Sequence, residues 1–204
     1  MKKEQLYPKT ARMAICNPVI TVTEKIDGAN LCIFKKYGEL YFAQRKTILS
    51  FEELNDKNKN TTYKGLIEWA HENFDSLDGL REDAAICGEW LGMGQIKYPK
   101  ETFDKKFYMF ATATVSPEST LYDFRYTQKF FESSFKDNKI SNCIGMVPIV
   151  KEYVFVPGVE NLDLLYEKYS RTVNRPVEGF VVHFDGAILK YVRMKRGKLQ
   201  EHHS

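Results

Sequence analysis

The chain has 204 residues, of which 43% are hydrophobic and 28% charged, and its formal net charge is +3. This length suits one domain with a sizeable core or two small ones, and the composition is that of an ordinary globular protein. Because the net charge is small, the field of the whole molecule does not identify a polyanion as partner, and any nucleic-acid site must be a local patch. No segment approaches the ~18 consecutive apolar residues of a membrane span, so no membrane partner is expected.

The cysteines indicate a protein of a reducing compartment. No two of them stand at the Cys-x-x-Cys spacing of a redox or metal motif, and three lie in apolar runs. Buried free thiols are therefore the expected state of Cys16, Cys32, Cys87 and Cys143, and a cytoplasmic location follows from that state.

The first half of the chain alternates short apolar runs with turn signals. Strands are predicted at Val19–Thr23, Ala29–Phe34 and Leu40–Gln44, and the break at Tyr37–Glu39 predicts a hairpin between the last two. A charged loop follows. Apolar residues then recur at helical spacing, which predicts one helix with a single apolar stripe over 62–75.

The second half of the chain is also rich in strands. Its strongest signal is a hairpin at the Asp185-Gly186 turn, with strands Gly179–Phe184 and Ala187–Val192 on either side. Gly92 to Pro99 marks an irregular loop. The remaining predicted elements are strands at Ala84–Trp90, Lys106–Thr112 and Val147–Phe155, a helix at Ser119–Lys136, and a helix carrying Leu162, Leu165, Tyr166 and Tyr169 on one side.

This order of elements predicts an α+β fold. Several strand pairs are local, and the helices are interspersed without the strict alternation of a doubly wound parallel sheet. Mainly antiparallel sheets with packed helices are therefore expected. No internal boundary is evident, so residues 1–204 are expected to form one domain with no separate C-terminal domain.

A short polar stretch, Lys25-Ile26-Asp27-Gly28-Ala29-Asn30, interrupts the apolar runs Val19–Val22 and Leu31–Phe34. A lysine that ends a strand before a turn directs its ammonium into a cleft, and Asp-Gly supplies the turn because Gly tolerates positive φ. A surface hairpin with a solvated lysine is an equally good interpretation of this stretch taken alone.

Other charged residues follow at strand ends or within apolar strands, namely Arg45, Glu89, Glu178 and Lys190. Charges among apolar strands are costly unless they are paired or hold a ligand. Taken singly, each is better explained as a solvated strand end or a snorkelling cation. His183, beside them in its strand, is expected to be a hydrogen-bonded core or edge histidine.

In their order along the chain, these segments resemble the motifs of the covalent nucleotidyltransferases, which include ATP-dependent ligases and mRNA capping guanylyltransferases. Asn30 and the Gly88–Trp90 segment are similar to RNA ligases. The 12-residue step from Glu178 to Lys190 is similar to phage-type RNA ligases. The resemblance spans about residues 19–193 and implies the ATP-grasp-like adenylylation domain of these ligases.

The resemblance implies an ATP-dependent RNA ligase that joins 5′-phosphate and 3′-hydroxyl ends through a lysyl-AMP intermediate. Lys25 would be the nucleophile, Asp27 would orient it or touch metal-bound water, and Lys190 would neutralise phosphate charge. Mg²⁺ or Mn²⁺ would be held by Glu178. The implied nucleotide contacts are Glu24, Asn30, Arg45, Glu89, Phe110, Glu178 and Lys190, with Phe110 preferred over Phe107 for stacking on adenine.

The sequence departs from the family pattern at two places. Ala111 follows Phe110 where an aspartate is usual, and Val192 stands where a second lysine is usual, with Arg193 or Lys195 as substitutes. A non-catalytic nucleic-acid-binding module of the same fold therefore stays open. DNA ligases and GTP-using capping enzymes are the alternatives within the superfamily.

The chain ends in a basic segment that suits a nucleic-acid backbone. Arg193, Lys195, Arg196 and Lys198 gather within a few residues of Lys190. Such a segment can track the phosphates of RNA ends, or of DNA ends in the alternative. A solvated basic terminus explains it equally well.

Overall fold

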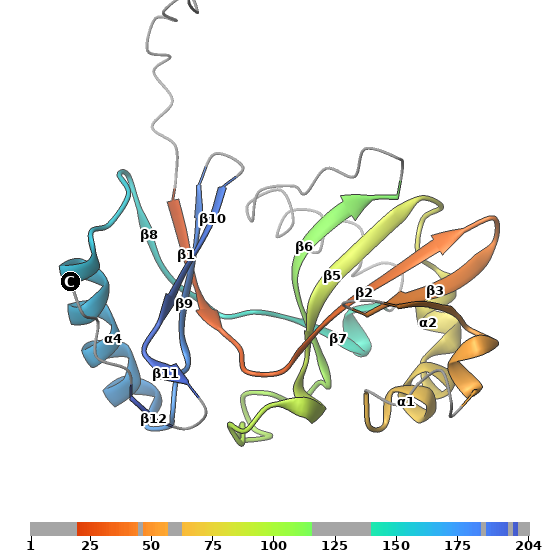
Figure 1. Ribbon diagram of the computed structural model, residues 1–204, viewed down its shortest axis with the longest axis horizontal. Coiled ribbons are helices and arrows are strands. Elements are labelled where there is room, and N and C mark those ends of the chain that lie inside the picture. The colour runs from red at the N-terminus through yellow and green to blue at the C-terminus, as the bar shows by residue number, and fades with distance from the viewer. Residues whose placement is uncertain are drawn as a thin grey trace, which may run out of the picture.

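The computed structural model describes residues 20–44, 47–56, 63–115, 140–184, 187–195 and 198–199. Within them the chain forms two main sheets with helices on their outer faces (Figure 1). Arg45 and the helix predicted at Ser119–Lys136 lie outside the described residues.

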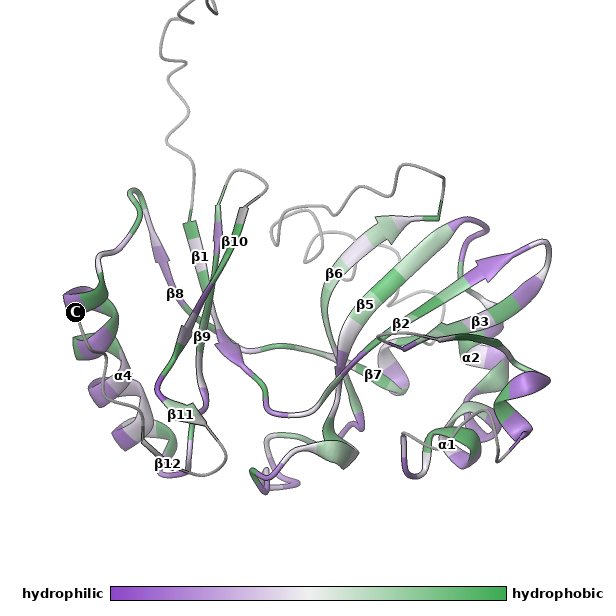
Figure 2. Cartoon of the chain, viewed as in Figure 1, coloured by the Kyte–Doolittle hydropathy of each residue, from purple (hydrophilic) through white to green (hydrophobic). Residues whose placement is uncertain are grey.

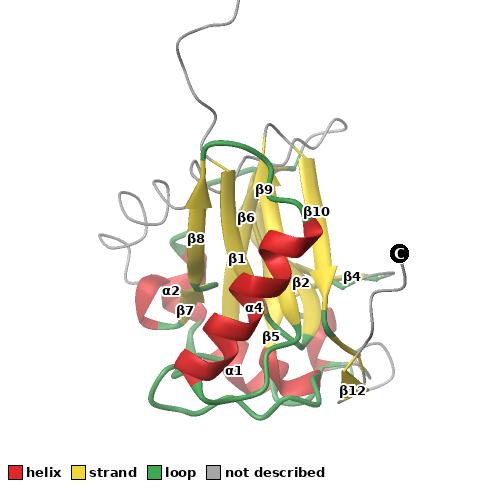
Figure 3. Cartoon of the chain, turned by 90° about the vertical axis from the view of Figure 1, so that its left-hand side faces the viewer, coloured by secondary structure: helices red, strands yellow, loops and turns green. Residues whose placement is uncertain are grey.

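The first sheet has four strands in the order β10-β9-β1-β8, and every neighbouring pair is antiparallel. Helix α4 (Val159–Val173) lies across its outer face (Figure 3). Leu162 and Tyr166 of α4 pack with Val22 and Phe180 of the sheet in one buried cluster. The strands are β1 (Ile20–Lys25), β8 (Ile149–Tyr153), β9 (Gly179–Phe184) and β10 (Ala187–Val192).

The second sheet has six strands in the order β4-β3-β2-β5-β6-β7. Its pairs are antiparallel except β6 with β7, which run parallel. Apolar residues run along β5, as expected for a central strand (Figure 2). The strands are β2 (Ala29–Lys36), β3 (Glu39–Ala43), β4 (Ile48–Ser50), β5 (Ala84–Trp90), β6 (Phe107–Thr114) and β7 (Ile144–Met146).

Two short helices cover the outer face of the six-stranded sheet, α1 (Leu66–Glu72) and α2 (Phe74–Asp78). The sequence predicted one helix here, which was wrong because the chain breaks at Asn73, whose φ of −114° and ψ of 14° are not helical. Their apolar residues still meet the sheet, as Trp69 packs against Trp90 with ring centroids 5.4 Å apart. The remaining short elements are 3-10 turns at Glu53–Asn55, Leu91–Met93 and Ile140–Asn142, and a two-stranded ribbon of β11 (Met194–Lys195) and β12 (Lys198–Leu199).

The chain passes between the two main sheets at two adjacent points. It leaves β1 and enters β2 through residues 26–28, and it returns from β7 to β8 through residues 147–148. The Glu24 N–H donates to the Pro148 carbonyl at 2.9 Å, which ties the two crossings together. Ile26 and Val147 lie in one buried cluster at this junction. The Lys25–Asn30 stretch therefore stands where the sheets meet.

The predicted α+β class and mainly antiparallel pairing are confirmed. The predicted strand at Ala84–Trp90 and the hairpin of Gly179–Phe184 with Ala187–Val192 have the observed bounds. The prediction missed β4 and β7, which are each three residues long. Among the helices that the structure describes, none has the length and apolarity to cross a membrane.

The expectation of free thiols was wrong for two cysteines. Cys32 and Cys87 form a disulfide, since they stand directly opposite each other on β2 and β5. Side chains at opposed positions of an antiparallel pair lie close enough to be bridged. Cys143 is free and buried as expected, and Cys16 lies outside the described residues. The prediction of a cytoplasmic location was based on free thiols, and two of these cysteines are not free thiols.

Candidate active site

A cavity of about 600 Å³ opens at the junction of the two main sheets. That volume is in the range of small-molecule sites. Its wall combines charged residues with apolar side chains, as nucleotide sites require. The lining comprises residues 23–30, Tyr63, Glu89, Phe110, Val147, Glu178, Val181, His183, Ile188 and Lys190.

Lys25 and Glu178 form the charged centre of this cavity. Lys25 is the last residue of β1, and its Nζ lies 2.5 Å from Glu178 Oε1. The two side chains are 22% and 17% exposed, so both keep access to the cavity. Burial raises the pKa of Glu178, and its hydrogen bond and ion pair with Lys25 oppose that rise. Within the described part of the chain, Glu178 Oε2 is buried without a hydrogen-bond partner.

Glu89 lies on the opposite side, near the end of β5. Burial raises its pKa to about 7, although the charge of Lys25 and a hydrogen bond from the Gly28 backbone both favour the ionised form. Space is tight at this point, because a Cβ on Gly28 would lie 2.9 Å from Glu89 Cγ. Gly28 therefore lets the turn after Lys25 approach the Glu89 carboxyl.

The two aromatic candidates of β6 face opposite ways. Phe110 is half-buried and lines the cavity. Phe107 is fully buried in the core beneath the six-stranded sheet, where its ring packs on Trp69. Strand alternation explains the difference, since residues 107 and 110 differ by an odd number of positions. Of these two residues, Phe110 is thus the one available to a ligand.

Lys190 and Asn30 complete the polar rim. Lys190 on β10 is exposed, and its charge favours the ionised form of Glu178. Asn30 on β2 is exposed directly opposite Glu89. Arg45, the remaining predicted nucleotide contact, lies outside the described residues.

Asp27 supports a loop beside the cavity. Its Oδ2 accepts hydrogen bonds from the backbone N–H groups of Gln95 at 2.6 Å and Ile96 at 2.9 Å. The Asp27 N–H donates to the Tyr98 hydroxyl at 2.7 Å. A Cβ at Gly94 would overlap the Asp27 carbonyl. One carboxylate oxygen of Asp27 therefore holds the 94–98 loop.

The carboxylates around the cavity suit a cation that also binds phosphates. In the described residues no group of three or more His, Cys, Asp or Glu side chains is arranged to enclose a metal ion. Mg²⁺ commonly keeps several waters and binds one or two carboxylates together with substrate phosphates. Glu178, with its unpartnered Oε2, fits that mode of binding.

The sequence model of the RNA ligase family matches residues 18–192. The chain belongs to the RNA ligase family. Its first strand, both main sheets and the whole cavity lining fall inside the match. No curated protein sequence matches the chain.

Solved structures of Naegleria gruberi RNA ligase share the fold of this family member. A mutant with AMP and Mn superposes with a TM-score of 0.60 at 17% identity, over 86% of this chain and 50% of that one. A mutant with ATP and Mn superposes with a TM-score of 0.59 at 17% identity, over 86% of this chain and 49% of that one. An apo mutant superposes with a TM-score of 0.57 at 18% identity, over 86% of this chain and 49% of that one. The chain thus spans about half the length of these proteins.

Glu24 does not face the cavity with its carboxylate in this RNA ligase family member. Successive residues of β1 point to opposite faces, so Glu24 faces α4 while Lys25 faces the cavity. Arg175 and Tyr169 hold both Glu24 oxygens. Only the Glu24 backbone is then left for the predicted nucleotide contact.

Sequence reasoning missed several residues at the site. Thr23 lines the cavity, and its hydroxyl lies 3.1 Å from His183 Nε2, so the expected core or edge histidine is also part of the wall. Period-two alternation back from Lys25 would have found Thr23. Arg175 carried no local signal, because its partner Glu24 is 151 residues away.

Proposed function

We propose that this RNA ligase family member is an ATP-dependent RNA ligase that carries AMP on Lys25. The observation that supports this most directly is the 2.5 Å approach of Lys25 to Glu178 at the wall of the 600 Å³ cavity. Family membership and the fold shared with Naegleria gruberi RNA ligase also support this proposal.

In the proposed first step, Lys25 Nζ attacks the α-phosphorus of ATP. A nitrogen–phosphorus bond forms, the bond to the bridging oxygen breaks, and pyrophosphate leaves. The amine must be neutral to attack, so Lys25 has to give up a proton. Glu178 touches Nζ, and its raised pKa makes it a better acceptor for that proton than an exposed carboxylate.

The cavity offers each part of the nucleotide a complementary partner. Phe110 would stack on adenine, and Glu89 with Asn30 would meet the ribose hydroxyls. Lys190 would lie along the phosphates, where charge develops during transfer. A divalent cation held by Glu178 would supply further charge neutralisation, and the Naegleria gruberi structures with ATP and Mn support this choice of cofactors.

The second and third steps join RNA ends. AMP passes from Lys25 to a 5′-phosphate, and a 3′-hydroxyl then displaces it to form the phosphodiester bond. RNA rather than DNA is proposed as substrate from family membership, Asn30 and the Gly88–Trp90 segment.

Intact-mass measurement after incubation with ATP and Mg²⁺ or Mn²⁺ tests the first step. We expect one added AMP, located on Lys25 by peptide mapping. Lys25→Ala should abolish the adduct because no other group would carry it, and Lys25→Arg should do the same because a guanidinium stays protonated. Parallel incubation with GTP and NAD⁺ identifies the donor. Normal adduct yield in both variants would contradict the assignment.

A non-catalytic nucleic-acid-binding module is the second candidate. Ala111 and Val192 favour it, because they replace a carboxylate and a cation of the family pattern. Absence of any adduct with all three nucleotides, together with measurable RNA binding, would establish this alternative.

A further inference from the structure

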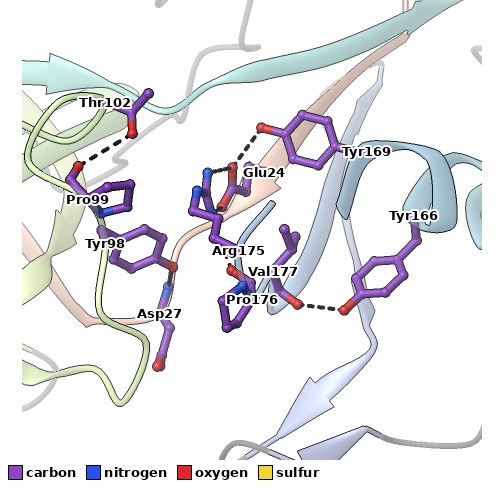
Figure 4. A network of polar contacts seen from close by, with 10 residues as sticks. All are labelled: Glu24, Asp27, Tyr98, Pro99, Thr102, Tyr166, Tyr169, Arg175, Pro176 and Val177. Carbon is purple, nitrogen blue, oxygen red and sulfur yellow. Dashed lines mark hydrogen bonds and ion pairs between the residues drawn. The ribbon is translucent and has the colours of Figure 1, made fainter. Parts of the chain in front are cut away.

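Glu24, the residue before Lys25, takes part in a buried ion pair. Arg175 Nη1 and Nη2 donate to Glu24 Oε1 at 2.5 Å and Oε2 at 2.6 Å, while the Tyr169 hydroxyl donates to Oε2 at 2.8 Å (Figure 4). The Glu24 side chain is 0% exposed and that of Arg175 is 8% exposed. Such a two-pronged, charge-assisted pair fixes direction as well as distance.

The other side of the Arg175 guanidinium meets the loop after β5. Its Cζ lies 5.2 Å from the ring centre of Tyr98 and 4.8 Å from that of Phe103, within the range of cation–π contact. Tyr98 in turn accepts the Asp27 N–H at 2.7 Å (Figure 4). Burial lowers the pKa of Arg175, but its hydrogen bonds and charge interaction with Glu24 outweigh burial and raise it.

Arg175 thereby holds the chain on both sides of Lys25. It is hydrogen-bonded to Glu24 directly, and it contacts the ring of Tyr98, whose hydroxyl accepts the Asp27 N–H. The same connector between α4 and β9 also carries Glu178, which contacts Lys25 itself. Two consecutive residues of β1 that face opposite sides of the sheet are thus paired with two residues of one short segment, Arg175 with Glu24 and Glu178 with Lys25.

We propose that Arg175 is a positioning residue for the Lys25 nucleophile, acting through Glu24 on one side and through Tyr98 and Asp27 on the other. This inference rests on the proposed function. A buried ion pair can also serve stability alone. The two roles differ in their consequence. Loss of positioning slows attack in the bound complex, whereas loss of stability lowers the melting temperature and leaves the folded enzyme active.

Arg175→Lys is the decisive variant, because lysine keeps the charge but not the planar fork. Single-turnover formation of the AMP adduct should slow at saturating ATP by about 10-fold to 100-fold, since small misplacements of a reacting group have effects of this size. The ATP concentration for half-maximal rate should change by less than about threefold, because Arg175 lies outside the cavity lining. An unchanged rate at saturating ATP would overturn the proposal. The proposal would also be overturned if the rate of adduct formation returned to the wild-type value at temperatures well below the melting temperature of the variant.

Arg171→Lys is the matched control. Arg171 lies four residues earlier, in the last turn of α4, and forms an exposed pair with Glu167, so its replacement should leave adduct formation unchanged. Tyr98→Phe tests the second arm without removing the ring. It takes away only the hydroxyl that accepts the Asp27 N–H, and it should slow the adduct step while Arg175 keeps its contact with the ring. A wild-type rate in Tyr98→Phe would remove this arm from the proposal.

Amide hydrogen exchange tests the proposal independently of ATP. Arg175→Lys and Tyr98→Phe should speed exchange at the Asp27, Gln95 and Ile96 amides, which make the hydrogen bonds of this turn. Exchange in β5 should not change. If the wild type forms no adduct, the proposed function fails. Unchanged exchange at the three amides in both variants would instead overturn the positioning role, whether or not the adduct forms.

Discussion

At Glu89, burial raises the pKa of the carboxyl and the charge of Lys25 lowers it; burial prevails, and the charges of Glu178 and Asp27 act in the same direction as burial. Its pKa rises from 4.5 to about 7. A carboxyl whose pKa is higher in the folded protein binds more protons there than in the unfolded chain. Its stabilising contribution is complete below about pH 4.5 and is lost as pH rises through about 7. The loss above pH 7 is at most about 3 kcal/mol.

Glu89→Gln should therefore flatten the pH dependence of stability. Glutamine keeps the shape of the neutral acid and does not ionise. The unfolding free energy of the variant relative to wild type should rise between about pH 4.5 and pH 8, as measured by urea denaturation. Glu101→Gln, at an exposed site, is the control. A constant difference across that interval would show that Glu89 is not desolvated.

Phe110 and Phe107, two phenylalanines of β6, allow loss of ligand stacking to be compared with loss of core packing. Phe110→Ala should weaken ATP use by roughly 1–3 kcal/mol, the usual range for loss of a base–aromatic stack, with a modest change in melting temperature. Phe107→Ala should instead destabilise the fold by about 3–5 kcal/mol, because its ring is fully buried. Adduct formation against ATP concentration and thermal melting separate the two effects. The reverse pattern would make Phe107 the ligand platform.

Among the elements, β9 is the one whose start places Glu178 beside Lys25. Its first residue, Gly179, pairs with Lys25 on one side and with Val192 on the other. Gly179 has a φ of +156°, and a Cβ there would overlap the Tyr191 carbonyl. Glycine is therefore required by both conformation and space, and the preceding residue is Glu178.

Gly179→Ala should push β9 away from β10 and displace Glu178 from Lys25. We expect a loss of stability of about 1–3 kcal/mol and a larger loss of adduct formation. Gly158→Ala is the matched control, since nothing lies within 4 Å of a Cβ at that position. Thermal melting and adduct yield are the measurements. Normal adduct yield in a folded Gly179→Ala protein would contradict the role given to this strand.

The sequence predicted those elements whose signals are local. The strand before Lys25, and the hairpin at residues 179–192, are set by apolar runs and turn residues that adjoin each other. Strand β7 (Ile144–Met146) was not predicted, because it is only three residues long and pairs in parallel with β6, which is distant in sequence. At the helix break, the Asn73 side chain donates to the Trp69 carbonyl at 2.8 Å, a contact that the apolar periodicity of this segment does not reveal.

Side-chain partners were predictable only where a family pattern named them. Lys25, Glu89, Phe110, Glu178 and Lys190, which the family pattern named, all line one cavity. The disulfide of β2 with β5 depends on strand register, which no local pattern contains. The Arg175 pair depends on how α4 ends against the first sheet. Both are long-range consequences of topology.

On the scale of the whole molecule, the site belongs to neither sheet alone. Lys25, Glu178 and Lys190 come from the four-stranded sheet and its connector, whereas Glu89 and Phe110 come from the six-stranded sheet. The two sheets are joined by the crossings at residues 26–28 and 147–148. Any change in their relative orientation would therefore alter the distance between the charged centre and the aromatic platform.

The distribution of positive charge over the whole molecule determines how RNA would be held. Phosphate contacts supply most of the non-specific affinity for nucleic acid, and this chain has a net charge of only +3. The basic segment at 193–198 was the predicted surface. Arg193 is already engaged there, since its guanidinium lies 2.9 Å from Asp163 and stacks over Tyr166. The remaining candidates in the segment are Lys195, Arg196 and Lys198.

Deletion of the basic segment would not separate an effect on RNA binding from an effect on the structure of the site. The backbone N–H groups of Arg193 and Met194 both donate to the Glu178 carbonyl, so a truncation at 193 would disturb the charged centre itself. Replacing Lys195, Arg196 and Lys198 together by glutamine removes the charges and keeps the chain. We expect adenylylation to be little changed, because the described residues that line the cavity all lie between Thr23 and Lys190.

RNA sealing by the triple variant should be weaker and less sensitive to salt. Each phosphate contact to a single strand contributes about 0.7 to the slope of log K against log salt, so three lost contacts should reduce the slope by about 2. Binding and sealing of a 5′-phosphorylated RNA, measured from low to physiological salt, give this slope. Lys168→Gln with Arg171→Gln, which removes two cations from the exposed side of α4, is the control for loss of charge elsewhere on the surface. If the triple variant keeps the wild-type slope, the basic segment is a solvated terminus. Lys97 and Lys100 in the loop beside Asp27 are then the next cations to replace, because that loop is hydrogen-bonded to Asp27 of the cavity wall.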